Sequence, residues 1–306
     1  MSLRKKILTA ALALGLVLSA QTGARAAVSN DDNQNDISWG SVESGNCLVT
    51  LHNWGFKACT KGVDPGIWRV AFIGDSHMRQ YFAPLDVLAH RYKWHVKYIS
   101  KSACTVGDWQ TYPHNRNTPS CWDWNRRLQK YLAGNPPFDL IVNSNSAFDS
   151  QADPAMAAAY KKLVVSQLQR GTQWLVISDN PKPANGFENC IAKDVKTAEF
   201  RCRTPYSVSM KPVDILPRTI HALPGVTVAD FRTTYCPHEC PAFMRGVKVY
   251  RDFSHISDVF ARTMLPELDA VIPDKFKNIE RIAIDKRAVR FDPVMKVSTL
   301  LTKAFY

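Results

Sequence analysis

Short apolar runs alternate with amphipathic stretches through most of the chain. Five runs have the length and composition of buried strands, at residues 67–73, 96–99, 140–143, 174–178 and 226–229. Apolar residues recur at helical spacing over residues 78–92, 122–132, 153–170 and 256–271. Apolar strands that alternate with helices indicate a parallel sheet covered by helices on both faces. We therefore predict an α/β fold whose site lies outside the carboxyl ends of the strands.

The two ends of the chain lack this pattern. The first 26 residues combine a basic start, an apolar stretch over 7–20 and the ending Ala24-Arg25-Ala26, which is typical of a secretory signal peptide. We predict an irregular, disulfide-stapled lead-in over 27–65, a catalytic domain over 66–273 and a C-terminal extension of unknown role over 274–306. The first apolar stretch is too short for a comfortable membrane span, and no later segment is long and apolar enough. We expect a periplasmic or secreted protein with no membrane span once the signal is removed.

The charge of the chain bears on its partners. The net charge is +12, and the first 26 residues carry four basic and no acidic side chains, so the exported part keeps +8. The net positive charge of the exported part favours binding to an acidic glycan or to an anionic membrane surface. Export makes nucleic acid the poorest candidate, so we expect no nucleic-acid partner.

Eight cysteines lie in the exported part, and an even number in an oxidising compartment indicates disulfides. Many pairings are formally possible. If each cysteine pairs with its neighbour in the sequence, the disulfides are Cys47–Cys59, Cys104–Cys121, Cys190–Cys202 and Cys236–Cys240. The alternative is zinc binding at Cys236-Pro237-His238-Glu239-Cys240, where no second Cys/His pair lies at ligand spacing. We expect neither a metal nor a cofactor.

The first strand candidate ends in a possible nucleophile. An apolar run ends at a glycine and is followed by an aspartate and a serine, in Phe72-Ile73-Gly74-Asp75-Ser76. A serine hydroxyl is a poor nucleophile unless a base removes its proton and a carboxylate orients that base. Ser76 is either such a nucleophile or only the cap of the following helix.

A candidate base and acid stand near the other end of the domain, at Asp252 and His255. Their spacing of three lets one turn bring the carboxylate to the imidazole Nδ1 while Nε2 faces Ser76. Asp252 has a plain alternative as a helix cap. His77 is the rival base, but a residue next to the nucleophile usually points away from its side chain.

Several motifs together resemble those of the SGNH (GDSL-type) hydrolases, and more closely the SGNH domain fused to membrane acyltransferase-3 proteins that modify bacterial surface glycans. The resemblance covers about residues 67–271. Its motifs are Gly74-Asp75-Ser76-His77, Cys121-Trp122-Asp123-Trp124-Asn125, Asp179-Asn180-Pro181 followed by Cys190, the pair Cys236 and Cys240, Tyr250-Arg251-Asp252 and His255-Ile256-Ser257.

The resemblance implies a three-layer α/β/α, flavodoxin-like fold with a mostly parallel sheet. It also implies that Ser76 is the nucleophile, His255 the base and Asp252 its orienting acid. The family's usual pattern adds oxyanion donors from a later glycine and asparagine, but this chain has no Gly-x-Asn-Asp after the strand at 140–143. Asn145 is the best remaining side-chain donor, with Asn143 close behind, and both are also ordinary turn residues.

Two groups of side chains near these motifs are candidates for binding substrate. Arg79 lies three residues after Ser76. Its two interpretations are contact with an acidic sugar and simple coverage of the helix surface. Aromatic faces stack on sugars, although such residues more often belong to the core. The aromatic candidates beside the loop from Cys104 to Cys121 are Trp109, Tyr112, Trp122 and Trp124.

These features predict an exported serine-dependent O-acyl esterase or O-acyltransferase, acting with acetyl as the favoured group on a cell-envelope or extracellular carbohydrate. The resemblance favours transfer, and a separately encoded membrane acyltransferase is then the expected partner. A non-catalytic secreted glycan-binding module is the alternative. A metallohydrolase built on His77, Asp75 and the Cys236 cluster is a third reading with little support from spacing.

Overall fold

The structure is a computed structural model of the 306-residue chain and describes residues 47–113, 119–147, 153–193, 198, 200–210 and 214–279. The signal peptide expected at 1–26 lies outside the described residues, as do positions 280–306 of the expected extension.

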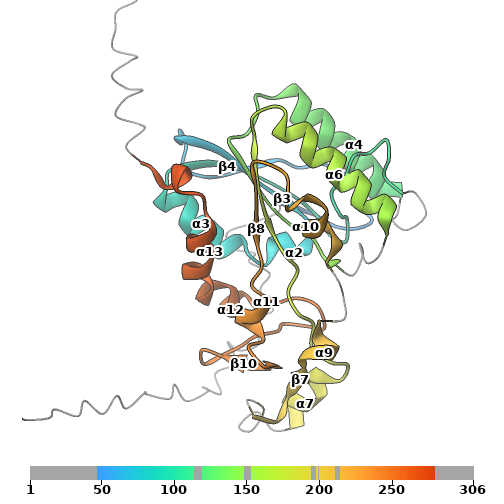
Figure 1. The fold of residues 1–306 in the computed structure, drawn as a ribbon, viewed down its shortest axis with the longest axis vertical. Helices are drawn as coiled ribbons and strands as arrows, with labels where there is room; N and C mark the ends of the chain where they lie inside the picture. The colour runs from blue at the N-terminus through green and yellow to red at the C-terminus, as the bar shows by residue number, and fades with distance from the viewer. Residues whose placement is uncertain are drawn as a thin grey trace, which may run out of the picture.

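A seven-stranded sheet forms the centre of the molecule (Figure 1). Its order is β1-β4-β3-β5-β6-β8, and all these neighbours run parallel, while β2 pairs antiparallel with β4. The strands are β1 (Leu48–Val49), β2 (Cys59–Gly62), β3 (Trp68–Gly74), β4 (Trp94–Lys101), β5 (Leu140–Ser144), β6 (Gln173–Ile177) and β8 (Val226–Ala229). The expectation of a mostly parallel sheet is confirmed.

Helices cover both faces of this sheet, which confirms the three-layer architecture (Figure 1). Phe72 of β3 belongs to one hydrophobic cluster and its neighbour Ile73 to the other, because successive side chains of a strand point to opposite faces. The first cluster includes residues of α2 (Ser76–Arg79), α3 (Phe82–Arg91), α12 (Asp258–Thr263) and α13 (Leu265–Val271). The second includes residues of α4 (Pro119–Gly134), α6 (Pro154–Leu168) and α10 (Ile215–Ile220).

Two helices expected to be continuous are each divided by a proline. The helix expected at 78–92 is split into α2 and α3, and the helix expected at 256–271 is split into α12 and α13. Pro84 and Pro266 lack a backbone N–H, and each ring would clash with the carbonyl four residues earlier. Those carbonyls belong to Gln80 and Arg262, close to the two breaks.

Residues 47–65 and 274–279, the described parts of the predicted lead-in and extension, belong to the folded domain. Where an irregular lead-in was predicted, β1 and β2 pair with β4 and extend the sheet. The start of the C-terminal extension forms a 3-10 turn at Asp274–Lys277. Phe276 of this turn is fully buried against Trp68, and the Phe276 carbonyl accepts a 2.9 Å hydrogen bond from Trp94 Nε1.

Short elements and disulfides form the region outside the carboxyl ends of the strands. In Figure 1, α7, α9, β7 and β10 lie together at the end of the molecule away from α4 and α6. The short elements are α7 (Phe187–Lys193), β7 (Arg203–Pro205), α9 (Tyr206–Ser209), α11 (Arg232–Tyr235), β9 (Glu239–Pro241), β10 (Phe243–Met244) and β11 (Val247–Lys248). The four disulfides join the sequence neighbours that were expected, at Cys47–Cys59, Cys104–Cys121, Cys190–Cys202 and Cys236–Cys240.

The disulfides and helices also bear on the compartment. Disulfides persist in oxidising environments, so four of them are typical of a protein outside the cytoplasm. Within the described ranges, no helix has the length and apolarity that a membrane crossing requires.

Gly74 is required at the end of β3 by the close approach of β5. A Cβ at this position would lie 2.0 Å from the Ser144 carbonyl oxygen and 2.7 Å from Met78 Cβ. Backbone of a neighbouring strand cannot move aside as a flexible side chain can. The glycine therefore lets the chain turn directly from β3 into α2.

We expect Gly74→Ala to destabilise the fold by roughly 3 kcal/mol, the upper part of the range for overpacked positions. Urea unfolding followed by circular dichroism measures this free energy. Gly134→Ala is the matched control, because a Cβ at Gly134, at the end of α4, meets nothing within 4 Å. An unfolding midpoint for Gly74→Ala equal to that of Gly134→Ala would contradict the close-packing argument.

Candidate active site

Ser76 lies where the order of the sheet reverses. β3 is flanked by β4 on one side and by β5 on the other. The chain therefore passes from β3 to β4 on one side and later crosses over to β5 on the other side. Such a switch point opens a crevice outside the carboxyl ends of the strands. Ser76 is the first residue of α2, two positions after β3 ends, which places its hydroxyl at that crevice.

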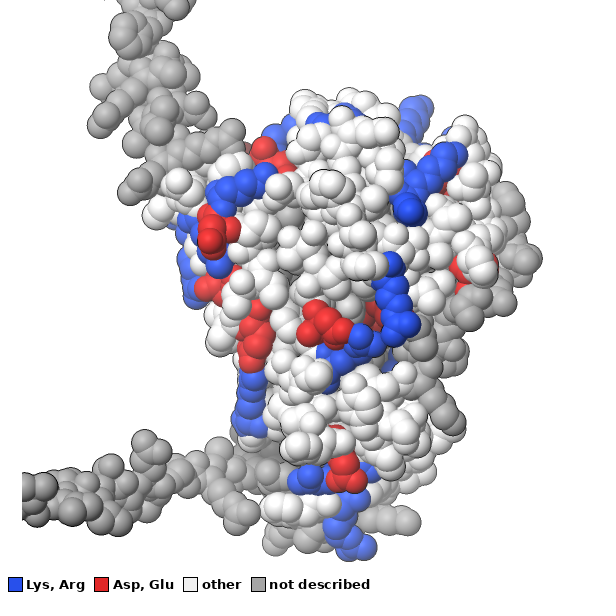
Figure 2. Space-filling model, in the orientation of Figure 1, with Lys and Arg blue, Asp and Glu red and all other residues white. Residues whose placement is uncertain are grey.

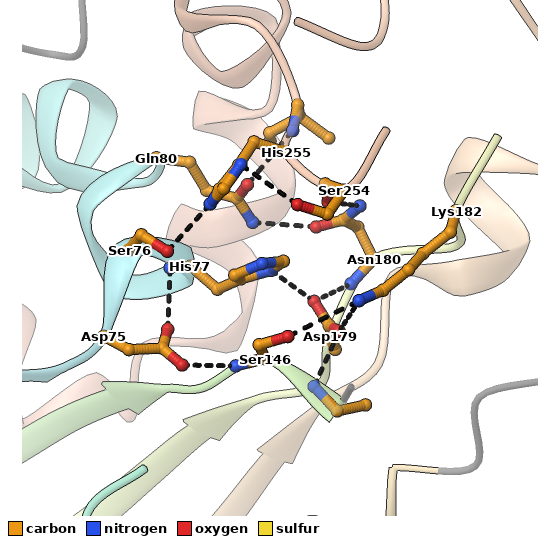
Figure 3. Close-up of polar contacts among 12 residues, drawn as sticks. Asp75, Ser76, His77, Gln80, Ser146, Asp179, Asn180, Lys182, Ser254 and His255 are labelled. Carbon is orange, nitrogen blue, oxygen red and sulfur yellow. Dashed lines mark hydrogen bonds and ion pairs between the residues drawn. The ribbon is translucent and has the colours of Figure 1, made fainter. Parts of the chain in front are cut away.

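Asp75, rather than Ser76, caps the helix. Its carboxylate accepts hydrogen bonds from the His77 amide at 2.7 Å and from the Ser146 amide at 2.8 Å (Figure 3). The second bond fixes the loop after β5 to the start of α2. The alternative in which Ser76 serves only as a cap is therefore wrong, since Asp75 does that work.

A closed turn holds Asp252 and His255. Tyr250 and Ile256 form an antiparallel bridge, and the Arg251 amide donates to the His255 carbonyl at 2.9 Å. Within the turn, Asp252 Oδ1 accepts from the Ser254 amide at 2.9 Å and from the His255 amide at 2.8 Å. Asp252 thus does not cap the next helix; Ser257 does, accepting from the Phe260 amide at 3.1 Å.

The turn brings the three residues of the expected triad together. His255 Nε2 lies 2.7 Å from Ser76 Oγ, and Figure 3 marks this contact with a dashed line. His255 Nδ1 lies 3.0 Å from both carboxylate oxygens of Asp252. These distances are within hydrogen-bond reach for a nucleophile and its base. The histidine is thus placed between a hydroxyl on one ring nitrogen and a carboxylate on the other.

Burial and the groups around the triad favour a neutral imidazole and an ionised carboxylate. Burial lowers the pKa of His255 to about 4, against the raising effect of Asp252. Burial alone would raise the pKa of Asp252, but hydrogen bonds from His255, Arg251 and the Ser254 amide hold it well below its usual range. Arg251 Nη2 lies 2.5 Å from Asp252 Oδ2 and 3.1 Å from His255 Nδ1. At neutral pH His255 is therefore free to accept a proton.

A chain of amide contacts joins the turn to α2. The Ile256 amide donates to Gln80 Oε1 at 3.1 Å, and Gln80 Nε2 donates to Asn180 Oδ1 at 2.9 Å. Asn180 Nδ2 in turn donates to the Ser254 carbonyl at 3.0 Å, so the connection closes on itself (Figure 3). Both amide side chains are buried. These contacts hold His255 at a fixed position relative to Ser76.

His77, the rival candidate for the base, faces Asp179 rather than the Ser76 hydroxyl. Its Nδ1 lies 2.6 Å from Asp179 Oδ1, and only 2% of its surface is exposed. Asp179 follows β6 and also accepts from the amides of Ala147, at 2.7 Å, and Asn180, at 2.9 Å. The contact to Ser76 Oγ is made by His255. The other expected candidate near the nucleophile, Arg79, is only 8% exposed.

The two candidate asparagines take different positions, Asn143 within β5 and Asn145 just after it. Asn143 Nδ2 donates to the Ile73 carbonyl at 2.7 Å, and its Oδ1 accepts from Tyr160 at 2.8 Å and from Asn145 Nδ2 at 3.1 Å. Asn143 therefore ties β3, β5 and α6 together. Asn145 lies past the end of β5, next to Ser146, whose amide is bound by Asp75. Of the two, Asn145 lies closer in the chain to the loop beside Ser76.

Two of the aromatic candidates and the cysteines of the metal-binding candidate belong to the core or to a disulfide. Tyr112 and Trp124 are 2% and 1% exposed, so they belong to the core rather than to a sugar-binding surface. Trp109 and Trp122 are half-buried and stack edge to face at 5.4 Å. Cys236 and Cys240 are oxidised to a disulfide, which removes the thiolates that zinc would need. Among the described residues, no group of His, Cys, Asp and Glu is arranged to hold a metal ion.

Comparison of this chain with known protein families and solved structures shows which family it belongs to. A family described as "SGNH domain (fused to AT3 domains)" matches residues 46–270. The chain belongs to this SGNH family. A solved structure of similar fold is the lipopolysaccharide acetyltransferase periplasmic domain of Salmonella ser. Paratyphi A, with a TM-score of 0.52 and 12% identity over 80% of this chain and 98% of that one. The comparison with curated proteins found no match.

Family membership makes this SGNH protein a hydrolase- or acyltransferase-type domain. The match begins at residue 46, which is consistent with β1 and β2 forming part of the sheet rather than a separate lead-in. The structural likeness, at this low identity, supports the fold.

Sequence reasoning gave no role to several residues around the triad: Gln80, Ser146, Asp179, Asn180, Lys182, Arg251 and Ser254. One signal was available for Asp179 and Asn180, since they directly follow an apolar run at the carboxyl end of a strand. Gln80 carried no such signal, because its role depends on contacts 100 and 176 positions away along the chain.

Proposed function

We propose that this SGNH protein is an exported serine-dependent O-acyl esterase or O-acyltransferase that acts on a cell-envelope or extracellular carbohydrate. The observation that carries the proposal is the contact of 2.7 Å between Ser76 Oγ and His255 Nε2, continued by Asp252 on the other ring nitrogen. Acetyl is the acyl group we favour. Residues 66–273 would form most of the catalytic unit, with β1 and β2 completing its sheet.

The proposed reaction has two acyl-transfer steps. Ser76 Oγ attacks the ester carbonyl while His255 Nε2 takes its proton, and the tetrahedral intermediate collapses as the imidazolium gives that proton to the leaving oxygen. The product is an ester on Ser76. Water or a sugar hydroxyl then attacks this ester, again with His255 as the base, which restores the serine. Asp252 holds the ring in the tautomer that leaves Nε2 free to accept.

Oxyanion stabilisation is assigned to the start of α2 and the loop after β5. The Ser76 amide is at the first position of the helix, where N–H groups have no partner within the helix. We propose that this amide and Asn145 Nδ2 donate to the oxyanion, while Asn143 maintains the loop through its contacts to β3 and α6. Such donors stabilise charge that develops only in the transition state.

The acceptor decides between ester hydrolysis and transfer. We favour transfer to an envelope carbohydrate, with a separately encoded membrane acyltransferase supplying the acyl group. On the face drawn in Figure 2, Lys and Arg alternate with Asp and Glu, and much of the surface is uncharged. Recognition of an acidic glycan is therefore proposed for the crevice at the site rather than for a broad basic surface on that face.

Intact mass after incubation with p-nitrophenyl acetate tests the proposal. We expect the oxidised protein to gain one acetyl group, and peptide mapping should place it on Ser76. Ser76→Ala should remain unmodified, while Ser166→Ala is the matched control, because Ser166 lies on α6 with its hydroxyl bonded to the Leu163 carbonyl. Added glycans that shorten the lifetime of the adduct and become acetylated would identify transfer.

Absence of both the adduct and p-nitrophenol release, with the fold intact, would count against the acyl-enzyme route. The non-catalytic glycan-binding module would then be the better description, and direct binding of glycans to the protein and to its Ser76→Ala variant would test it. Equal binding by both proteins would favour that module.

A further inference from the structure

A second histidine–carboxylate pair lies against the proposed base. The rings of His77 and His255 are 4.5 Å apart between centroids and inclined by 37°. His77 Nδ1 lies 2.6 Å from Asp179 Oδ1, and both side chains are 2% exposed. The proposed mechanism uses neither residue. His77 is too buried to touch a substrate, so any influence on the reaction has to act through its neighbour.

Both members of the pair are held in place by the fold. His77 sits in the first turn of α2, and its amide donates to Asp75. Asp179 is fixed by the amides of Ala147 and Asn180. The Asp179 amide donates at 2.8 Å to Asp214, the N-cap of α10. These contacts leave little freedom for the carboxylate to move away from the imidazole.

Opposite charges stabilise each other when they are buried in contact. Burial alone lowers the pKa of His77, but the charge and hydrogen bond of Asp179 outweigh it, so the pKa of His77 is raised from its ordinary value. For Asp179, burial raises the pKa, but His77 outweighs this and the pKa is lowered. His77 is therefore cationic and Asp179 anionic under conditions where His255 is neutral.

We propose that His77, held as an imidazolium by Asp179, is a positioning residue that disfavours a second positive charge on His255 and so keeps that base able to accept the Ser76 proton in mildly acidic surroundings. The inference rests on the proposed function of Ser76 and His255. A cation beside the imidazole raises the free energy of its protonated form, so protonation of His255 then requires a lower pH.

Other charged groups act on the two rings from each side. On the side of His77, they are Asp75, Asp179 and Lys182, and Asp214 lies behind Asp179. On the side of His255, they are Asp252 and Arg251. Asp252 favours protonation of His255, whereas Arg251 and His77 both oppose it. Removing the charge of His77 takes away one of the effects that oppose protonation and leaves burial and Arg251 to act against Asp252, so the pKa of His255 should rise.

Titration of the histidine ring signals by NMR tests this inference without any need for turnover. In His77→Gln we expect the midpoint of His255 to move up by about one pH unit, roughly a tenfold gain in proton affinity. Asp179→Asn should move it in the same direction, because His77 then loses the charge that keeps it protonated. His221→Gln is the matched control, since His221 is exposed at the end of α10. His77→Lys, which restores a cation, should return the midpoint toward its original value.

An unchanged His255 midpoint in folded His77→Gln would overturn the inference. If the variant does not fold, the unmodified protein still decides: a His77 ring that becomes neutral while His255 is still protonated contradicts the proposal. Should the protein hydrolyse p-nitrophenyl acetate, the acid limb of kcat/KM should shift upward by the same amount in His77→Gln. A shifted NMR midpoint without turnover would instead leave this inference standing and count against the proposed function.

Discussion

Replacement of His255 by alanine is expected to lower kcat for p-nitrophenyl acetate by roughly 10⁴- to 10⁶-fold, the range found when one member of such a triad is removed. Ser76 Oγ then loses the base that lies 2.7 Å away, and its proton has no acceptor during attack. Ser76→Ala should cost about as much, because the acyl group loses its attachment point. Initial rates of p-nitrophenol release measure both effects.

The double variant sharpens this prediction. Ser76 and His255 act as one unit, so Ser76→Ala combined with His255→Ala should be scarcely slower than either single variant. His221→Ala, in an exposed position remote from the triad in the sequence, should retain full activity. Losses that multiply in the double variant would show that the two residues act independently, contrary to the geometry.

Asp252→Asn is expected to reduce kcat by roughly 10³- to 10⁴-fold with little loss of stability. The amide oxygen of asparagine can still accept from the Ser254 and His255 amides, as Oδ1 of the aspartate does. Its Nδ2, however, presents N–H groups to His255 Nδ1 and to Arg251 in place of a carboxylate. The ring would then favour the tautomer with its proton on Nε2, which cannot accept from Ser76.

A comparison with Asp252→Ala separates these two roles of Asp252. The alanine variant loses the acceptor inside the turn as well as the carboxylate, so its free energy of unfolding should fall, by about 1–3 kcal/mol for the unsatisfied amides. Urea unfolding and steady-state kinetics on both variants provide the readouts. Full activity in folded Asp252→Asn would exclude the orienting role.

The sequence predicts the fold well because β3, β5 and β6 are buried on both faces. A strand of that kind consists of a short, nearly continuous apolar run, so the runs near residues 70, 141 and 175 are recognisable without a partner in view. β1 and β2 differ, since they are short and only partly buried. Their place in the sheet depends on pairing with β4, and such pairing has no local signature.

The sequence identifies the chemical groups of the site, but it does not identify the contacts that hold them in place. Ser76, Asp252 and His255 are identifiable because serine, carboxylate and imidazole follow strand or turn signals in a recognisable order. The contacts of Gln80 to Asn180 and Ile256 and the stacking of His77 on His255 join segments that are distant in sequence. Local pattern carries no information about these contacts, and they determine how the base is held and charged.

Ser76 and His255, the proposed nucleophile and base, are in contact although they lie 179 residues apart in the chain. Ser76 begins α2 near the start of the domain, whereas the turn with His255 follows every strand of the sheet. A growing or partly threaded polypeptide therefore carries an inert serine, because the imidazole that would activate it has not yet arrived. Any acyl transfer at Ser76 would therefore require the last stretch of the domain to be in place.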